Sequence, residues 1–274
     1  MKYIIWNFVS IAIGFSLILP ISSFAQNRTE EIVVPLSEVG SRGKLEVHIH
    51  RGRVTIEGSN RTEDVLVEVS SEDKDRQAQR TYPNGLKRIP NNVTNIRIEE
   101  DGNEIEIHGD HSNKVSDLFI ELPSNFDLEI HTHHNGDILV SNVSGVMELN
   151  SHHGPITAKD ISGAVVANTH HGAIKASFKD VNSDVPMAFS TYHGNVELKL
   201  PSNTAFSGKL QSSRGEILTD FEMTVKPDPD RVKKRNENGH FEVNLGGWVY
   251  GDVNQGGPEF MMKTYHGDII IQKN

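Results

Sequence analysis

A short motif that ends in glycine returns seven times along the chain, and this repetition limits the fold more than any other feature. Full copies include "NSHHGPI", "NTHHGAI" and "STYHGNV", and weaker copies are "IHRGRVT" and "SSRGEIL". The motif glycines are Gly52, Gly136, Gly154, Gly172, Gly194, Gly215 and Gly267. The central copies are spaced by 18, 18, 22 and 21 residues. Such a period predicts stacked structural repeats.

Each copy predicts two short strands joined at the glycine. Apolar residues alternate before the motif, as in Met187 and Phe189, and after it, as in Val196 and Leu198. Alternation with period two is typical of strands with one buried face. A small hydroxyl residue precedes most motif glycines: Thr132, Ser151, Thr169, Thr191, Ser212 and Thr264. Glycine permits a positive φ at a corner where a Cβ would clash.

A unit of 18–22 residues cannot bury its apolar face alone, but stacked copies can. Equivalent residues would then lie about 4.7–4.9 Å apart on successive coils. The unit is too short for a propeller blade, which needs roughly 40 residues. We therefore predict an all-β, single-domain β-solenoid resembling a parallel β-helix, with an all-β sandwich of accidental regularity as the alternative.

The remaining segments fit around this stack, and residues 26–274 are predicted to form the one domain. Strands within 30–70 open the fold, and "IRIEEDGNEIEIHG" is predicted to form a hairpin. Two polar, turn-rich segments, 73–92 and 226–259, are predicted to be excursions. The second one separates the last two motif glycines.

Residues 1–25 have the pattern of a secretory signal peptide. A basic Lys2 is followed by an apolar stretch over 4–21, and small residues stand at Ser23 and Ala25. An uncleaved membrane anchor is the alternative, because the stretch approaches spanning length. We expect an exported protein, periplasmic or extracellular at the cell envelope, with no transmembrane segment after cleavage.

The cysteine content and net charge of the chain limit the kinds of protein and partner to expect. The chain has no cysteine, which excludes a disulfide scaffold and a cysteine-linked lipid anchor. Its formal net charge is −10, and an acidic surface argues against nucleic acid as a partner. An envelope protein or a surface glycan is the expected partner.

The order of segments carries a resemblance. Strand pairs come first, then "LFIELPSNFDLEIHTHHNGDILV", then successive motif copies, and finally "KTYHGDIIIQ". This order resembles the bacterial putative-adhesin domain family, which consists of secreted or envelope β-solenoid domains of unknown function. The resemblance covers about residues 33–272 and implies an adhesin-like interaction or scaffolding module. That family commonly has asparagine or serine where this chain has histidine, so it implies no role for the histidines.

Eight of the 14 histidines fall within the motif copies, at the positions shortly before the glycine: His133, His134, His152, His153, His170, His171, His193 and His266. Stacking would place His153, His171 and His193 on successive coils, where imidazoles could converge on Zn²⁺, Ni²⁺ or Cu²⁺ between coils. The candidate metal ligands are His134, His152, His153, His170, His171 and His193.

A purely structural ladder of stacked planar groups explains the same pattern and is the favoured interpretation, with no cofactor. Tyr192 and Tyr265 stand in place of a histidine in two copies, and Arg51 and Arg214 occupy the motif in two others. These residues keep the stacking and lose the ligand nitrogen. A cluster that responds to pH is the third interpretation.

An enzyme is not expected. Asp137 and Asp268 each follow a motif glycine, but the copies between them have Pro155, Ala173, Asn195 and Glu216 at that position, so the column is not a carboxylate cluster. No serine elbow, phosphate loop or zinc-protease motif is present. In the second excursion, Phe241, Trp248 and Tyr250 are candidate interaction residues, and the alternative is that they close one end of the solenoid.

Overall fold

The computed structural model describes residues 28–71, 96–109, 115–182, 184–228, 233–237, 240–244 and 247–274. The predicted signal peptide and the predicted excursion at 73–92 lie outside these residues. Over the described ranges the chain forms strands and turns without a helix, so the all-β prediction is confirmed. Accordingly, nothing in these ranges forms a helix that is long and apolar enough to cross a membrane.

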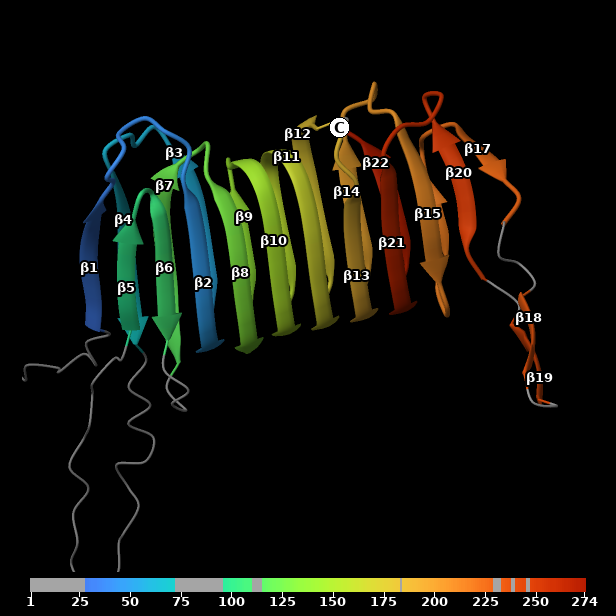
Figure 1. Ribbon diagram of the computed structural model, residues 1–274, viewed down its shortest axis with the longest axis horizontal. Helices are drawn as coiled ribbons and strands as arrows, with labels where there is room; N and C mark the ends of the chain where they lie inside the picture. The colour runs from blue at the N-terminus through green and yellow to red at the C-terminus, as the bar shows by residue number, and fades with distance from the viewer. Residues whose placement is uncertain are drawn as a thin grey trace, which may run out of the picture.

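Two ladders of strands make up the main sheet (Figure 1), and they face each other across the core. The first layer runs, in spatial order, through β5 (Ile96–Asp101), β6 (Glu104–Gly109), β2 (Lys44–Arg51), β8 (Asp127–His134), β10 (Ser144–His153), the second half of β11 (Ile156–His171), β13 (Met187–His193), β21 (Glu259–His266), β15 (Phe206–Ser212), β20 (Val249–Val253) and β17 (Met223–Lys226).

The second layer is built the same way. In spatial order it runs through β1 (Arg28–Pro35), β4 (Asp64–Ser71), β7 (Ser116–Pro123), β3 (Val54–Ser59), β9 (Ile138–Ser141), the first half of β11, β12 (Ile174–Val181), β14 (Val196–Leu200), β22 (Ile269–Lys273) and β16 (Ile217–Thr219). Each motif turn leads from a strand of the first layer into a strand of the second. β18 (Lys233–Glu237) and β19 (His240–Asn244) form a separate antiparallel hairpin.

Strand direction differs between the middle of the stack and its ends. Neighbouring coils in the middle pair in parallel and in register, as β10 does with β11 and β13 does with β21. At one end β1, β4 and β5 pair antiparallel, and at the other end β20 and β17 do so. These antiparallel strands cover the terminal coils of the parallel stack, whose edges would otherwise offer unpaired backbone groups.

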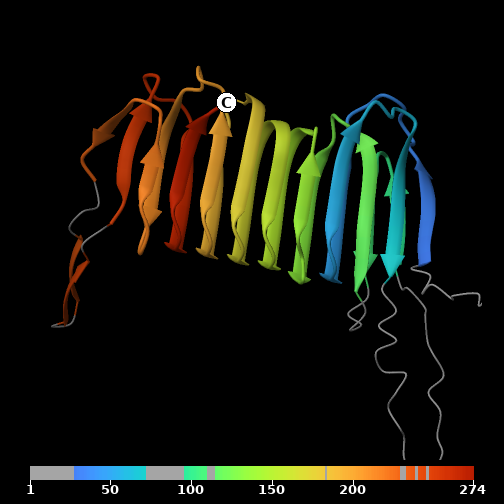
Figure 2. The same cartoon turned by 180° about the vertical axis from the view of Figure 1, so that it is seen from behind.

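Spatial order departs from sequence order at both ends. The coil of β2 and β3 lies between the coil of β6 and β7 and that of β8 and β9. The coil of β21 and β22, the red strands in Figures 1 and 2, lies between that of β13 and β14 and that of β15 and β16. Residues 249–253 of the predicted excursion belong to the first layer as β20.

The core lies between the layers and is filled by the inward half of each strand. Leu45, Val47 and Phe189 have no exposed surface, and the rings of Phe206 and Phe260 stack at 4.8 Å between centroids. Burial of such a side chain contributes roughly 1.5–3 kcal/mol. This shared core holds the motif turns at one corner of the stack.

Candidate functional site

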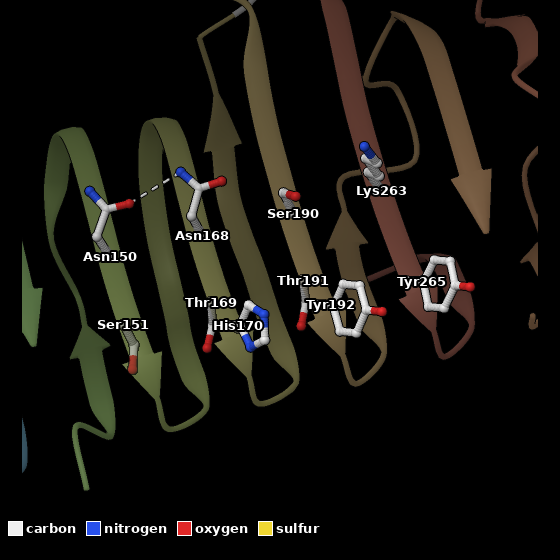
Figure 3. A pocket seen from close by; sticks show the side chains of 10 residues that line it. All are labelled: Asn150, Ser151, Asn168, Thr169, His170, Ser190, Thr191, Tyr192, Lys263 and Tyr265. Atoms are coloured by element: carbon white, nitrogen blue, oxygen red, sulfur yellow. Dashed lines mark hydrogen bonds between the residues drawn. The ribbon is translucent and has the colours of Figure 1, made fainter. Parts of the chain in front are cut away.

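The motif turns form a single corner along the stack, and Figure 3 shows part of it from close by. Parallel pairing sets His153 beside His171, His171 beside His193, and His193 beside His266. The copy that contains Gly267 therefore lies next to the copy that contains Gly194, although the Gly215 copy comes between them in the sequence.

A ladder of hydroxyl groups fixes the corner from the inside. The buried Thr169 hydroxyl donates to the carbonyl of Gly154 at 2.9 Å, and that of Thr191 donates to Gly172 at 2.8 Å. The equivalent bonds elsewhere run from Ser151 to Gly136, from Thr264 to Gly194 and from Ser212 to Gly267. These five coils are thus each bonded to a neighbour through the motif itself, whereas the Thr132 hydroxyl donates to Gly136 of its own turn at 2.9 Å.

Glycine is required because the coils approach each other closely. A Cβ on Gly194 would lie 2.3 Å from the carbonyl oxygen of Gly172, and one on Gly267 would lie 2.0 Å from that of Gly194. Gly194 also has a φ of 141°. The expectation of a positive φ is wrong for Gly136, Gly172 and Gly215, which do not adopt one. Gly172 and Gly215 instead lie against the backbone of a neighbouring coil, whereas a Cβ on Gly136 would meet the Thr132 side chain of its own turn at 2.2 Å.

Two columns of planar side chains run along the outside of this corner. The first column consists of the rings that stand two positions before a motif glycine, or three positions before Gly136. Its members are His50, His133, His152, His170, Tyr192 and Tyr265. The second column contains Arg51, His134, His153, His171, His193, His266 and Arg214. Successive rings of the first column are 4.7–5.3 Å apart and 2–18° from parallel.

The second column stacks in the same manner, at 4.6–5.2 Å and 3–21° from His134 to His266. Arginines stand at both of its ends. Arg51 pairs in register with His134, and the Arg214 guanidinium lies over the Tyr265 ring at 5.3 Å. The second column is therefore a run of five imidazoles with an arginine at each end.

Neighbouring rings of one turn are tilted instead of stacked. His152 and His153 make an angle of 57° and bring their Nδ1 atoms to 2.8 Å. His170 and His171 do the same at 54° and 2.9 Å. One nitrogen of each pair must donate and the other accept, which selects a tautomer for each ring. Where tyrosine replaces the first histidine this bond is lost, and the buried Nδ1 of His266 has no partner among the described residues.

Protonation is disfavoured at four histidines of this corner. The pKa values of His134, His152, His171 and His266 all lie below the usual histidine value. Partial removal from water is the main cause in each case, and the charges of neighbouring imidazoles come next for His152 and His171. Arg214 adds to the effect at His266.

A second group of histidines lies on the outward face of the first layer. His48 stacks between His108 and His131 at 5.3 and 4.7 Å. Glu129 lies beside this group and accepts a hydrogen bond from Lys44 at 2.8 Å. Burial is the main cause that lowers the pKa of His48, followed by His131 and His108. The sequence did not single out these residues, because His48 and His131 lie two positions before the first column and His108 belongs to no copy of the motif.

Two open depressions mark the same outward face. One, of about 410 Å³, is lined by polar side chains and by three rings of the first column (Figure 3): Asn150, Asn168, Ser190, Lys263, His170, Tyr192 and Tyr265. The other, of about 430 Å³, is lined by His48, His108, His131 and their neighbours. Both are shallow and accessible from solvent along several coils.

The structure also places the other predicted residues. The six predicted ligands, His134, His152, His153, His170, His171 and His193, all lie on the corner. Trp248 is half-buried beneath Lys209, whose Nζ lies 5.1 Å from its ring, and Tyr250 belongs to β20 at the end of the stack. Phe241 lies on β19, in the separate hairpin. Three coils separate Asp137 from Asp268.

Comparisons with known proteins add little to this picture. No family model and no curated protein matches the chain. A solved structure of a putative cell adhesion protein from Clostridium sporogenes is 13% identical, with a TM-score of 0.45, over 91% of this chain and 100% of that one. A putative adhesin from Bacteroides fragilis is 11% identical, with a TM-score of 0.31, over 91% and 98%. At these values the likeness decides nothing about function, and membership of the adhesin-like family stays a prediction.

Proposed function

We propose that the protein is an exported, non-catalytic β-solenoid that serves as an interaction or scaffolding module of the cell envelope. Parallel, in-register pairing of successive coils supports the solenoid. The signal-peptide pattern of residues 1–25 supports export. The expected partner is an envelope protein or a surface glycan.

The repeated polar face of the first layer carries this proposal. Asn150, Asn168, Ser190 and Lys263 occupy equivalent positions on successive strands, and the Asn168 side chain donates to Asn150 at 3.1 Å. Because stacking covers the faces of the adjacent rings, a partner meets ring edges, tyrosine hydroxyls and amides. Such a surface suits an extended partner that is contacted through several equivalent hydrogen bonds.

The arrangement of carboxylates supports a non-catalytic role. Asp137 and Asp268, with three coils between them, are too far apart to act together on one bond of a substrate. Asp268 lies beside Glu216, but its Oδ1 accepts a hydrogen bond from the Glu216 backbone at 2.9 Å. Its own backbone N–H donates to Asn195 at 2.9 Å. These bonds give Asp268 a role in holding coils together.

Binding to intact cells and to isolated envelope fractions tests the proposal. Asn168→Arg and Ser190→Arg place a long charged side chain in the depression that Asn150, Asn168, Ser190 and Lys263 line. Each is expected to reduce binding at least tenfold. The matched control is Thr157→Arg, which changes the outward side of the second layer. Equal binding by all variants would show that this face is not the contact surface.

A further inference from the structure

The angles between the corner histidines decide which of them can share a metal ion. The lone pair of an imidazole nitrogen lies in the plane of its ring, and a metal binds about 2.0–2.1 Å from each nitrogen. His133 and His152 are stacked within 2° of parallel, so their lone pairs run side by side. Rings stacked within one column therefore do not chelate an ion by themselves.

Tilted rings from different columns, in contrast, can direct their nitrogens towards a common point. His152 and His153 meet at 57°, and His133 and His153 meet at 60°. Each of the three residues offers one nitrogen, and these nitrogens all lie within 4.8 Å of one another. The Nδ1 atoms of His152 and His153 already lie 2.8 Å apart, so an ion would take the place of the proton they share.

The surroundings of these three rings favour an accessible but positioned site. His133 and His152 are exposed, and His153 is half-buried. Stacking against His134 and His171, at 5.2 and 4.9 Å, holds the His153 ring from both sides. An ion can thus enter from solvent, and water completes its coordination.

A neighbouring group consists of His50, His133 and His134, and it shares His133 with the first group. Arg51 stands next to His134 in the second column and contributes to the lowered pKa of that histidine. The same positive charge opposes a bound cation. Among the described residues, the pair of His170 and His171 has no third ligand within comparable reach. The group of His133, His152 and His153 is therefore the stronger candidate.

We propose that His133, His152 and His153 form a transition-metal site that binds Cu²⁺ most tightly and Zn²⁺ less tightly. A donor set of imidazoles suits these ions, and affinity rises towards Cu²⁺ along the first-row series. The site goes beyond the interaction surface and does not depend on it. Like the metal site expected from the sequence, it spans two coils: the histidine pair of one turn supplies two ligands, and the neighbouring coil supplies the third.

Titration of the metal-free chain with Cu²⁺ alone, followed by Zn²⁺ alone, tests the site. The unmodified protein should bind one Cu²⁺ saturably and show nitrogen couplings from several imidazoles in its electron paramagnetic resonance spectrum. His133→Tyr and His152→Tyr should each lower the affinity at least tenfold. Tyrosine keeps the ring in its stack, as Tyr192 does at 5.1 Å from His170, so these variants should retain their fold.

His193→Asn is the matched control, because His193 lies in the same column without a histidine beside it in its turn. It should bind Cu²⁺ like the unmodified protein. Three results would overturn the site: no saturable binding by the unmodified protein, unchanged binding by His133→Tyr and His152→Tyr, or an equal loss in His193→Asn. Circular dichroism and thermal melting of each variant exclude loss of fold as the cause.

Discussion

The two halves of the corner share one backbone frame and differ in the chemistry that they present. The histidine half comprises the turns at Gly136, Gly154 and Gly172, and the tyrosine half comprises those at Gly194 and Gly267. In both halves the hydroxyl of one coil donates to the glycine carbonyl of the next at 2.8–3.0 Å. Rings also stack at similar spacings in both halves. The frame is therefore independent of which ring it carries.

The halves differ in what their ring edges can do. His152 with His153 and His170 with His171 form hydrogen-bonded pairs, whereas Tyr265 leaves the Nδ1 of His266 without a partner among the described residues. Only the histidine half brings three ligand nitrogens together. The type of ring thus determines which hydrogen bonds and metal ligands the corner offers. The glycine and hydroxyl residues hold the coils together.

The largest expected effect concerns the frame that both halves share. Gly154→Ala and Gly194→Ala should each lower the free energy of unfolding by about 3 kcal/mol, because the new Cβ would meet a neighbouring backbone. Those contacts would lie at 2.6 and 2.3 Å. Urea denaturation measures the loss. Gly208→Ala is the control: its nearest contact would be a methionine methyl group at 3.4 Å, and a similar loss there would contradict the argument.

The hydroxyl ladder should have a smaller effect, again equal in both halves. Thr169→Val and Thr191→Val keep the side-chain shape and remove the donor to the glycine carbonyl. Each should cost about 1–2 kcal/mol, because the buried carbonyl loses a partner. Thr224→Val, on the exposed edge strand β17, should stay within about 0.5 kcal/mol. Unequal losses at Thr169 and Thr191 would show that the two frames differ.

Acid should weaken the corner through its histidines. A pKa that is lower in the folded chain than in the unfolded one, near 6.5, means that the unfolded chain takes up more protons. This contribution is complete above pH 6.5 and is lost as the pH falls through the lower, folded pKa values of His152 and His171. Thermal melts between pH 7 and pH 5 should show a steeper loss in the unmodified protein than in the double variant His152→Asn/His171→Asn. His108→Asn, on the exposed face, should keep the steep loss.

The smallest effect is expected from converting one half towards the other. Tyr192→His places an imidazole beside His193 and keeps the stack, so the free energy of unfolding should change by no more than about 0.5 kcal/mol. Denaturant titration measures this directly. A loss above about 2 kcal/mol would mean that the tyrosine ring is part of the frame and that the two halves are not interchangeable.

Much of this corner could be predicted from the sequence, because its period is set by short-range spacing. The all-β class and the shared turn motif follow from alternation and from the glycines. The position of the closing coil could not be predicted, since insertion between two earlier coils leaves no periodic signal and a long connection adds little closure entropy. Ring tilts also escape prediction, because they depend on packing of each side chain against its neighbours. His48 and His131 were also missed, because they become neighbours only when β2 pairs with β8 in the folded stack.

The insertion of β21 and β22 into the stack has a consequence for how the molecule assembles. Residues 259–273 supply the coil that pairs with β13 and β14 on one side and with β15 and β16 on the other. The earlier coils therefore cannot close in the order in which the ribosome makes them, because a slot must stay open until this segment arrives. Such long-range closure slows folding. It keeps the stack incomplete until residues 259–273 are available to pair on both of their sides.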